Sequence, residues 1–401
     1  MKIVIRSTQV IVALLFIISG LVKANDPLGL SYKMEEFFEI WNTGLGNGNF
    51  FAKNMLISFF SFLHHYSLFL SIVMITLEII AGFALLMGWR KKFILWLLLV
   101  LIVFFTFLTG YAYLSVHPDG SPKFTNCGCF GDCLPITPKT SFLKDLALMA
   151  MIIALIFGRK YLLQLFSDKT RRIILAAALV LSLLAQWYVL NYLPFVDCLP
   201  FKKGKNITEQ MKQPPGSYGD STAIRYVYEK NGRRYEWDWN ELPADFETYT
   251  YIDRIDKLVR KGNAEPPIKN FSLTGADYFD STSGSTAKND STSIVLAQPI
   301  AIIGFGLGES DKNDWVNVFR EISTIASGKN IPVYFATNER RRMIRFFEAH
   351  QIKVQVFACD FTNIRTAART QPTFYLLRSG TIIDKYSYRQ LNHLKSDIEK
   401  L

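Results

Sequence analysis

Four of the five cysteines form a group whose spacing could support sulfur chemistry. Cys127, Cys129 and Cys133 lie in one short segment, Asn-Cys-Gly-Cys-Phe-Gly-Asp-Cys, and Cys198 follows after a further apolar stretch. The glycines let the segment turn tightly and hold its sulfur atoms close together. These thiols could form structural disulfides, exchange disulfides with a partner, or bind a metal together with His117. Four cysteines allow three pairings, which the sequence does not distinguish.

Two charged side chains lie within or beside apolar sequence. Glu78 falls midway through Met-Ile-Thr-Leu-Glu-Ile-Ile-Ala-Gly-Phe. A carboxylate is costly in hydrocarbon, so we predict that it faces a helix bundle's interior and is protonated, paired or solvated by a cavity. A functional group and a hydrogen bond between helices both fit this position. Lys23 ends an earlier apolar run and could extend its ammonium to the membrane surface. The lone Cys359 is predicted to be a small core residue.

The elements that must position these residues are long apolar helices. Runs of about 20 apolar residues match the roughly 30 Å hydrocarbon core of a bilayer. Lys144 and Asp145, at the start of the fourth such run, are predicted to lie at the membrane surface. The five predicted spans are residues 8–22, 66–88, 93–115, 142–157 and 173–193.

The distribution of charge predicts how these spans are oriented. Most of the formal net charge of +11 lies in short loops between apolar runs, which argues against a nucleic-acid partner. Cytoplasmic loops are enriched in Lys and Arg, so residues 90–92 and 159–172 are predicted to be cytoplasmic. The N-terminus of this inner-membrane, multi-pass protein is then cytoplasmic, and the clustered cysteines are outside. That oxidising compartment favours disulfides over a metal site. The first run also fits a signal peptide, whose cleavage would leave the cysteines on the same side.

After the last span the chain becomes polar and rich in turns. Residues 225–238 alternate around an Asn-Gly pair, which predicts a β-hairpin. Later segments alternate between strand and helix patterns, which predicts a small extracytoplasmic α/β sandwich. The predicted strands are 293–304, 332–336, 353–357, 373–377 and 381–386, and the predicted helices are 315–327, 339–350 and 390–401. We predict three domains: a bundle (1–195), a hairpin-containing linker region (196–265) and the α/β domain (266–401).

Four motifs in the first half resemble the DoxX/MauE family of small redox-associated membrane proteins. They are Ser19-Gly-Leu-Val-Lys23, Asp26-Pro-Leu-Gly29, Leu77-Glu-Ile-Ile-Ala-Gly82 and Asn126-Cys-Gly-Cys-Phe-Gly-Asp132. The resemblance covers about residues 1–200 and implies a four-helix membrane bundle, here with one further helix. It also implies a link to disulfide formation or to quinone-coupled sulfur oxidation. The family carries Cys127 and Cys129, whereas Cys133 and Cys198 look like additions that favour a second disulfide.

Residues 267–401 resemble a thioredoxin fold. The segment Gln371-Pro372-Thr373-Phe-Tyr-Leu-Leu, followed by Ser379-Gly380, is similar to the cis-proline strand and hairpin of thioredoxins. Thioredoxins place Cys-x-x-Cys at a helix N-terminus after the first strand, where the helix lowers the thiol pKa. The corresponding residues here, 306–315, contain no cysteine. The resemblance therefore implies a binding or docking module around Pro372 rather than a thiol nucleophile.

Two functions fit these residues. In the first, Cys127 and Cys129 exchange disulfides with an envelope client or redox partner, Glu78 carries protons or makes a polar contact, and a quinone accepts electrons. In the second, the protein is a non-catalytic scaffold in the lipid bilayer with structural disulfides and a thioredoxin-like docking domain. The resemblance favours the first function, while the substrate, and whether any catalysis occurs, are not assigned by the sequence.

Overall fold

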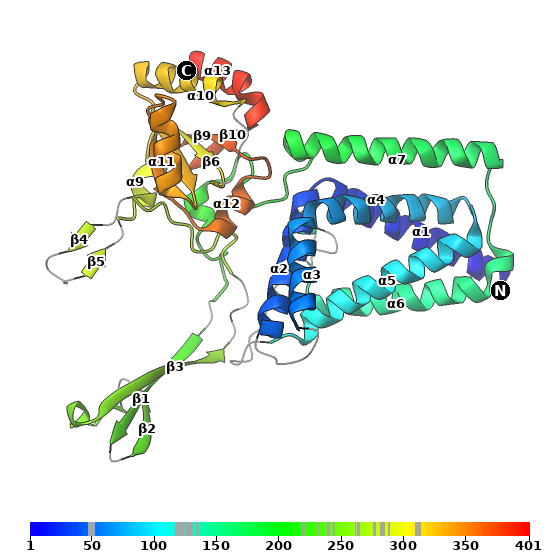
Figure 1. Cartoon of the computed structure of the whole chain (residues 1–401), viewed down its shortest axis with the longest axis horizontal. Helices are drawn as coiled ribbons and strands as arrows, with labels where there is room; N and C mark the ends of the chain where they lie inside the picture. The colour runs from blue at the N-terminus through cyan, green and yellow to red at the C-terminus, as the bar shows by residue number, and fades with distance from the viewer. Residues whose placement is uncertain are drawn as a thin grey trace.

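The computed structural model describes the chain apart from residues 47–52, 117–123, 125–130, 134–135, 219–220, 231, 239–240, 244, 261, 263–264, 276–277, 281–284, 288 and 309–313. Figure 1 shows three separate parts: a bundle of long helices, a small three-stranded sheet and an α/β domain. The α/β domain lies at one end of the bundle, opposite the end that carries the N-terminus.

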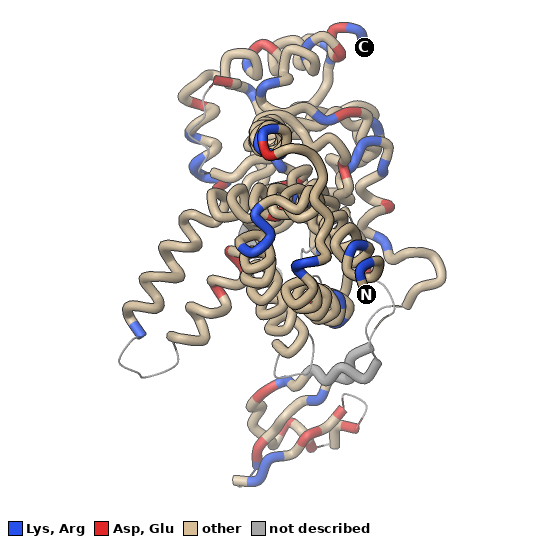
Figure 2. Tube along the Cα trace, turned by 90° about the vertical axis from the view of Figure 1, so that its right-hand side faces the viewer, with Lys and Arg blue, Asp and Glu red and all other residues tan. Residues whose placement is uncertain are grey.

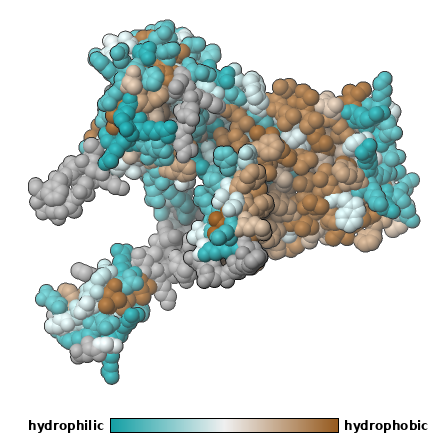
Figure 3. Space-filling view, in the orientation of Figure 1, coloured by the Kyte–Doolittle hydropathy of each residue, from teal (hydrophilic) through white to brown (hydrophobic). Residues whose placement is uncertain are grey.

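Five helices are long and apolar enough to cross a membrane. Figure 3 shows a broad hydrophobic surface over the bundle and a hydrophilic cap at its far end. Within the bundle, many of the Lys and Arg residues lie at the end with the N-terminus (Figure 2). The number of spans and the approximate positions predicted from apolar run length are confirmed. The five helices are α1 (Lys2–Ala24), α4 (Ser67–Leu86), α5 (Lys91–Leu114), α6 (Pro138–Phe157) and α7 (Asp168–Asn191).

Two further helices, α2 (Pro27–Gly46) and α3 (Lys53–His65), cross the other end of the bundle roughly at right angles to the spans (Figure 1). The sequence analysis predicts no helix between the spans at 8–22 and 66–88. Helix α2 buries Met34, Phe37 and Phe38 against the bundle. We call the end covered by α2 the disulfide end, because the Cys133–Cys198 bond lies there.

Helices α1 and α4 pack against each other most closely at two glycines. A Cβ atom on Gly20 would lie 2.5 Å from Ile79, and one on Gly82 would lie 3.0 Å from the carbonyl oxygen of Ala13. Small residues let membrane helices approach closely. This contact brings the C-terminal turn of α1 against the middle of α4, where Glu78 lies.

The C-terminal domain has a thioredoxin-like fold. The five-stranded sheet has the order β10-β9-β6-β7-β8, in which β6 is parallel to β7 and antiparallel to β9. Two apolar clusters cover its faces, because Ile303 and Phe305 of β6 point to one side and Ile302 to the other. The strands are β6 (Ala301–Phe305), β7 (Val333–Thr337), β8 (Gln355–Ala358), β9 (Thr373–Arg378) and β10 (Thr381–Ser387). The helices are α10 (Val316–Gly328), α11 (Arg340–Ala349), α12 (Phe361–Ala367) and α13 (Leu391–Glu399).

The single strand predicted over residues 293–304 is wrong. The chain forms a short helix, α9 (Thr292–Leu296), before β6 begins. Pro299 separates the two, since proline has no amide N–H to donate to a sheet. Helix α8 (Ile207–Gln210) and the strands β4 (Tyr278–Asp280) and β5 (Ser285–Ala287) are small additions to this domain.

The hairpin predicted from the Asn-Gly pair is confirmed. It consists of β1 (Ser221–Lys230) and β2 (Arg233–Asp238), with Tyr228 opposite Tyr235. A third strand, β3 (Thr250–Arg260), pairs antiparallel with the other edge of β1. The domain boundaries at 195 and 265 stay a prediction.

Candidate functional site

An ion pair lies inside the bundle. The ammonium nitrogen of Lys23 is 2.5 Å from Glu78 Oε1, and their side chains are 3% and 2% exposed. Glu78 therefore faces the interior and is paired, one of the arrangements predicted for it. The expectation that Lys23 extends to the membrane surface is wrong. The close contact of α1 with α4 places its ammonium against Glu78 instead.

Neighbouring groups complete the surroundings of this pair. The hydroxyl of Ser19 donates to Glu78 Oε2 at 3.2 Å. The Lys23 ammonium also lies 4.4 Å from the centre of the Phe105 ring, a cation–π contact from α5. Ser19 and Lys23 are four residues apart on α1, so they share one face of the helix.

A second ion pair lies on α6. The Lys144 ammonium is 2.6 Å from Asp145 Oδ1, and Thr109 on α5 donates to Asp145 Oδ2 at 3.0 Å. The Asp145 side chain is 1% exposed, whereas that of Lys144 is 27% exposed. Asp145 is thus enclosed by the bundle, and the prediction that both residues lie at the depth of the membrane surface stays a prediction.

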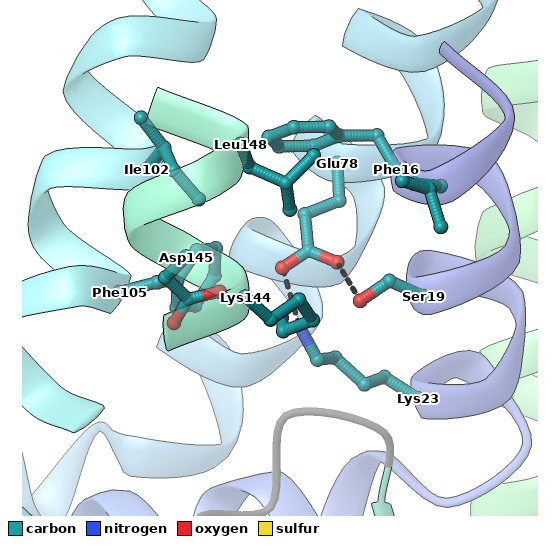
Figure 4. Close-up of a pocket in the computed structure, with 10 residues that line it drawn as sticks. Phe16, Ser19, Lys23, Glu78, Ile102, Phe105, Lys144, Asp145 and Leu148 are labelled. Carbon is teal, nitrogen blue, oxygen red and sulfur yellow. Dashed lines mark hydrogen bonds and ion pairs between the residues drawn. The ribbon is translucent and has the colours of Figure 1, made fainter. Parts of the chain in front are cut away.

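The two pairs border one cavity of about 30 Å³, large enough for a water molecule. Figure 4 shows Ser19, Lys23 and Glu78 converging from α1 and α4, with Lys144 and Asp145 on the neighbouring α6. We call the following residues the charged cluster: Ser19, Lys23, Glu78, Thr109, Lys144 and Asp145. Apolar side chains line the rest of the cavity: Leu15, Phe16, Ile102, Phe105 and Leu148.

The charged cluster can hold and move protons. It joins two carboxylates and two ammonium groups, so its formal charges balance. Charged groups inside a membrane are costly and mark functional pathways more often than structural contacts. Among the described residues no group of three or more His, Cys, Asp or Glu side chains could hold a metal ion.

The corner between α1 and α2 connects the charged cluster to the disulfide. Two residues after Lys23, the Asn25 side chain makes two hydrogen bonds with the backbone of Val196, at 2.8 and 3.0 Å. Val196 precedes Cys198, whose sulfur is bonded to Cys133. The 3-10 turn η1 (Gly131–Cys133) contacts both α1 and α2.

The same corner holds the thioredoxin-like domain. Asp26 pairs with Arg369 at 2.7 Å, and both side chains are largely buried. Glu35 on α2 pairs with Arg365 at 2.6 Å. The guanidinium groups of Arg365 and Arg369 lie 4.1 and 5.5 Å from the ring of Tyr32. Burial raises the pKa of this tyrosine.

A third ion pair attaches the domain beside the disulfide. Lys385 on β10 lies 2.7 Å from Asp197, the residue before Cys198. Burial lowers the pKa of Lys385, although Asp197 opposes the shift. The three ion pairs fix the domain to the disulfide end of the bundle.

The thioredoxin-like domain retains part of a thioredoxin site. The Gln371–Pro372 peptide bond is cis, and the amide of Leu307 donates to the Gln371 side chain at 2.9 Å. Cys359 is buried and forms no disulfide with the cysteines that the structure describes. Burial raises the pKa of its thiol to about 12, as expected for an inert core residue.

Three residues singled out from the sequence, Cys127, Cys129 and His117, lie outside the described residues. The structure joins the other two cysteines of this group, Cys133 and Cys198, with a Cα–Cα distance of 4.8 Å. It brings Lys23 and Glu78 together, while Pro372 lies in the other domain.

The sequence analysis missed Asp145 and the two docking arginines. Asp145 could have been found from spacing, because Ser141, Asp145, Leu148 and Ile152 recur at intervals that place them on one helix face. The partners of Arg365 and Arg369 lie more than 300 residues away, on a helix that was not predicted.

Different parts of the chain match different known families. Residues 1–158 match the family described as Methylamine utilisation protein MauE. Residues 222–261, which cover much of the three-stranded sheet, match a domain of unknown function, DUF8463. No curated protein matches the chain.

Several solved structures match about a third of the chain. A thiol:disulfide interchange protein from Bacteroides sp. has 11% identity, covers 32% of this chain and 86% of its own, and gives a TM-score of 0.24. A putative protein disulfide isomerase from Bacteroides thetaiotaomicron has 12% identity, with 33% and 89% covered and a TM-score of 0.21. The apo Sco1 protein from Thermus thermophilus has 11% identity, with 33% and 92% covered and a TM-score of 0.22.

The sequence resemblance is thus confirmed over the bundle, and the strand order and cis-proline assign the fold of the C-terminal domain independently. The chain is a multi-pass membrane protein whose residues 1–158 match the MauE family and whose C-terminal domain has a thioredoxin-like fold.

Proposed function

We propose that this protein exchanges disulfides with a client on the extracytoplasmic side of the inner membrane, through Cys127 and Cys129. The observation that carries the proposal is the charged cluster, which lies in the membrane near the disulfide end, where the loop that contains both cysteines joins α5 to α6. Thiol exchange needs groups that take up and return protons, and we assign that role to the charged cluster.

The exchange step has a simple balance. A client thiolate attacks the disulfide between Cys127 and Cys129, so that this S–S bond breaks and a mixed disulfide forms. The second client thiolate attacks the mixed disulfide, which releases an oxidised client and leaves both cysteines as thiols. The two client protons move to these cysteines, and Glu78, paired with Lys23, acts as the intermediate proton carrier.

Repeated turnover needs an acceptor for two electrons, and we propose a membrane quinone. A cleft of about 740 Å³ between α2, α3, α4 and α5 has a suitable size and an almost wholly apolar lining. Aromatic rings of Phe38, Trp41, Phe60, Phe104 and Tyr111 line it. Such a group, when bound, would take two electrons and two protons from the reduced cysteines.

The test is a trapping experiment in cells. In a Cys129→Ala variant, the lone Cys127 thiolate attacks the disulfide of an oxidised client, the exchange step run in reverse, which breaks the client S–S bond and releases one client thiol. Cys129 is absent and cannot resolve the mixed disulfide, which is expected to accumulate and is detected by non-reducing electrophoresis and mass spectrometry. A Cys359→Ala variant is the matched control and should trap nothing. If Cys127 and Cys129 are fully oxidised and insensitive to mild reductant, exchange is excluded.

The scaffold function makes the opposite prediction. The ion pairs that bind the thioredoxin-like domain to the bundle are the observation that favours it. A Cys127→Ser/Cys129→Ser variant would then lower the amount of protein in the membrane without changing the redox state of any client.

A further inference from the structure

Around the cavity, buried polar residues of the four-helix core lie toward the disulfide end. A further buried polar residue, Gln9 on α1, lies at the opposite end, beyond Val12, where its side chain donates to the carbonyl oxygens of Leu85 and Leu163. On α6 the buried face reads Ser141, Asp145, Leu148, Ile152 and Leu155 from the disulfide end inward. The polar residues are thus the two nearest the disulfide end, and the deeper three are apolar.

The other core helices follow the same order. On α1, Lys23 and Ser19 border the cavity, and Phe16 and Val12 follow toward the other end. On α5, Thr109 contacts Asp145, and buried Ile102 and Leu98 follow. The cavity therefore has polar groups toward the disulfide end and an apolar floor of Phe16, Ile102 and Leu148.

Ser141 has an unsatisfied hydroxyl one turn from Asp145. Its side chain is fully buried, and its Oγ finds no hydrogen-bond partner among the residues described. Buried hydroxyls in proteins are satisfied by protein groups or by ordered water. Ser141 lies between Asp145 and the start of α6, so water at this hydroxyl would extend the cavity toward the disulfide end.

Lys144 lies where the water-filled extension of the cavity would meet the aqueous phase. Among the four side chains of the two ion pairs, that of Lys144 is the most exposed, at 27%. Its ammonium contacts the buried carboxylate of Asp145. Water, Ser141 and the Lys144–Asp145 pair would together connect the cavity at Glu78 with the aqueous phase.

We infer that the charged cluster is the inner end of a one-sided aqueous inlet. It opens at the disulfide end past Lys144 and Ser141, and Phe16, Ile102 and Leu148 close it from the other face of the membrane. Glu78 exchanges protons with the compartment that contains the disulfide and with no other. The inlet itself stands apart from sulfur exchange, whereas its use to supply protons for that exchange rests on the proposed function.

Cysteine accessibility tests the inlet directly. The background is the full chain with Cys127, Cys129 and Cys359 changed to Ser, in which Cys133–Cys198 remains. In sealed vesicles, Ser141→Cys is treated with a small, positively charged, membrane-impermeant methanethiosulfonate reagent from either side. We expect labelling from the disulfide side to be at least about tenfold faster than for Ile152→Cys, because thiol reactivity follows access to water.

Matched controls make the result decisive. Ile152 lies on the same face of α6 but below the apolar floor, and Ile153 lies on the outer surface of the bundle. Labelling of Ser141→Cys at the rate of Ile152→Cys, or from the opposite side, would overturn the inlet. If Ser141→Cys does not fold, Thr109→Cys replaces it with the same expectation. This background cannot exchange disulfides, so failure of the inlet is distinguished from failure of the proposed function.

Discussion

The membrane bundle encloses charged side chains among its apolar helices, whereas the sheet of the thioredoxin-like domain packs on apolar residues. The bundle encloses Lys23, Glu78 and Asp145, although lipid makes such groups costly. The thioredoxin-like domain packs both faces of its sheet with aliphatic and aromatic residues, and its one cysteine is inert. The fold of a thioredoxin is therefore present without a Cys-x-x-Cys pair, while the bundle encloses charged groups.

This contrast shows which features of each domain its fold does not require. An apolar helix spans a membrane without any internal charge, so the charged cluster is not a requirement of the bundle fold. The thioredoxin-like domain instead presents charges on its surface, where Arg365, Arg369 and Lys385 contact acidic residues near the disulfide end. We interpret the bundle as the reactive part and the domain as the part that is positioned by it.

Removing one half of the Lys23–Glu78 pair should give the largest effect. Glu78→Leu leaves a buried ammonium without its partner, which costs about 3–5 kcal/mol in the free energy of unfolding. The double variant Lys23→Met/Glu78→Leu should recover most of that stability. Denaturant unfolding in detergent measures both values.

The double variant also separates stability from chemistry. If it is stable and exchanges disulfides as fast as the parent, the pair is structural and the contrast between the domains fails. If it is stable and exchange is slow, the charged cluster is functional.

Breaking the disulfide should have the next largest effect. The Cys133–Cys198 bond joins residues 65 apart in sequence and ties the α5–α6 loop to the segment before the thioredoxin-like domain. Cys133→Ala/Cys198→Ala should lower the free energy of unfolding by about 2–4 kcal/mol, because the unfolded chain gains freedom. Calorimetry under non-reducing conditions measures the loss, and an unchanged melting temperature would show that the ion pairs alone hold the domain.

Arg369 should matter more than an exposed cation on the same domain. Arg369→Met leaves Asp26 largely buried and unpaired, which should weaken the attachment by about 1.5–3 kcal/mol. The matched control Lys203→Met breaks a solvent-exposed pair with Asp384 and should cost less than about 1 kcal/mol. Hydrogen exchange of α2 and α12 reports the attachment. Equal protection in both variants would show that the Asp26–Arg369 pair does not position the domain.

The sequence predicts elements whose signal is local. Apolar run length found all five spans, and the Asn-Gly pair found the β1–β2 hairpin, because both depend on neighbouring residues. The strand at 293–304 failed because hydrophobicity alone does not separate a short buried helix from a strand. The cost of burying a charge correctly placed Glu78 in the interior.

The remaining site residues depend on contacts distant in sequence. Lys23 was predicted to reach the surface because its helix end is near an interface, and only the packing of α1 on α4 brings it to Glu78. Asp145 was assigned to the interface because it follows a lysine. The α2 segment, and with it the docking of Arg369, required the tertiary fold.

The smallest predicted effect concerns Cys359 and sharpens the view that the domain's thiol is inert. Burial raises its pKa from 9.0 in an ordinary thiol to about 12. Between these values the unfolded chain has released the thiol proton and the folded domain retains it. The resulting contribution to stability is complete below about pH 9 and is lost as the pH rises toward 12.

At about pH 10 this loss amounts to about 1.4 kcal/mol, and Cys359→Ala should remove it from the pH dependence. Tyr375, whose pKa burial also raises, remains in both variants, so the difference between their stability curves isolates Cys359. The native thiol should also resist iodoacetamide at pH 8. Rapid alkylation there would mean that the domain holds an accessible thiolate, and the division of roles between the two domains would have to be abandoned.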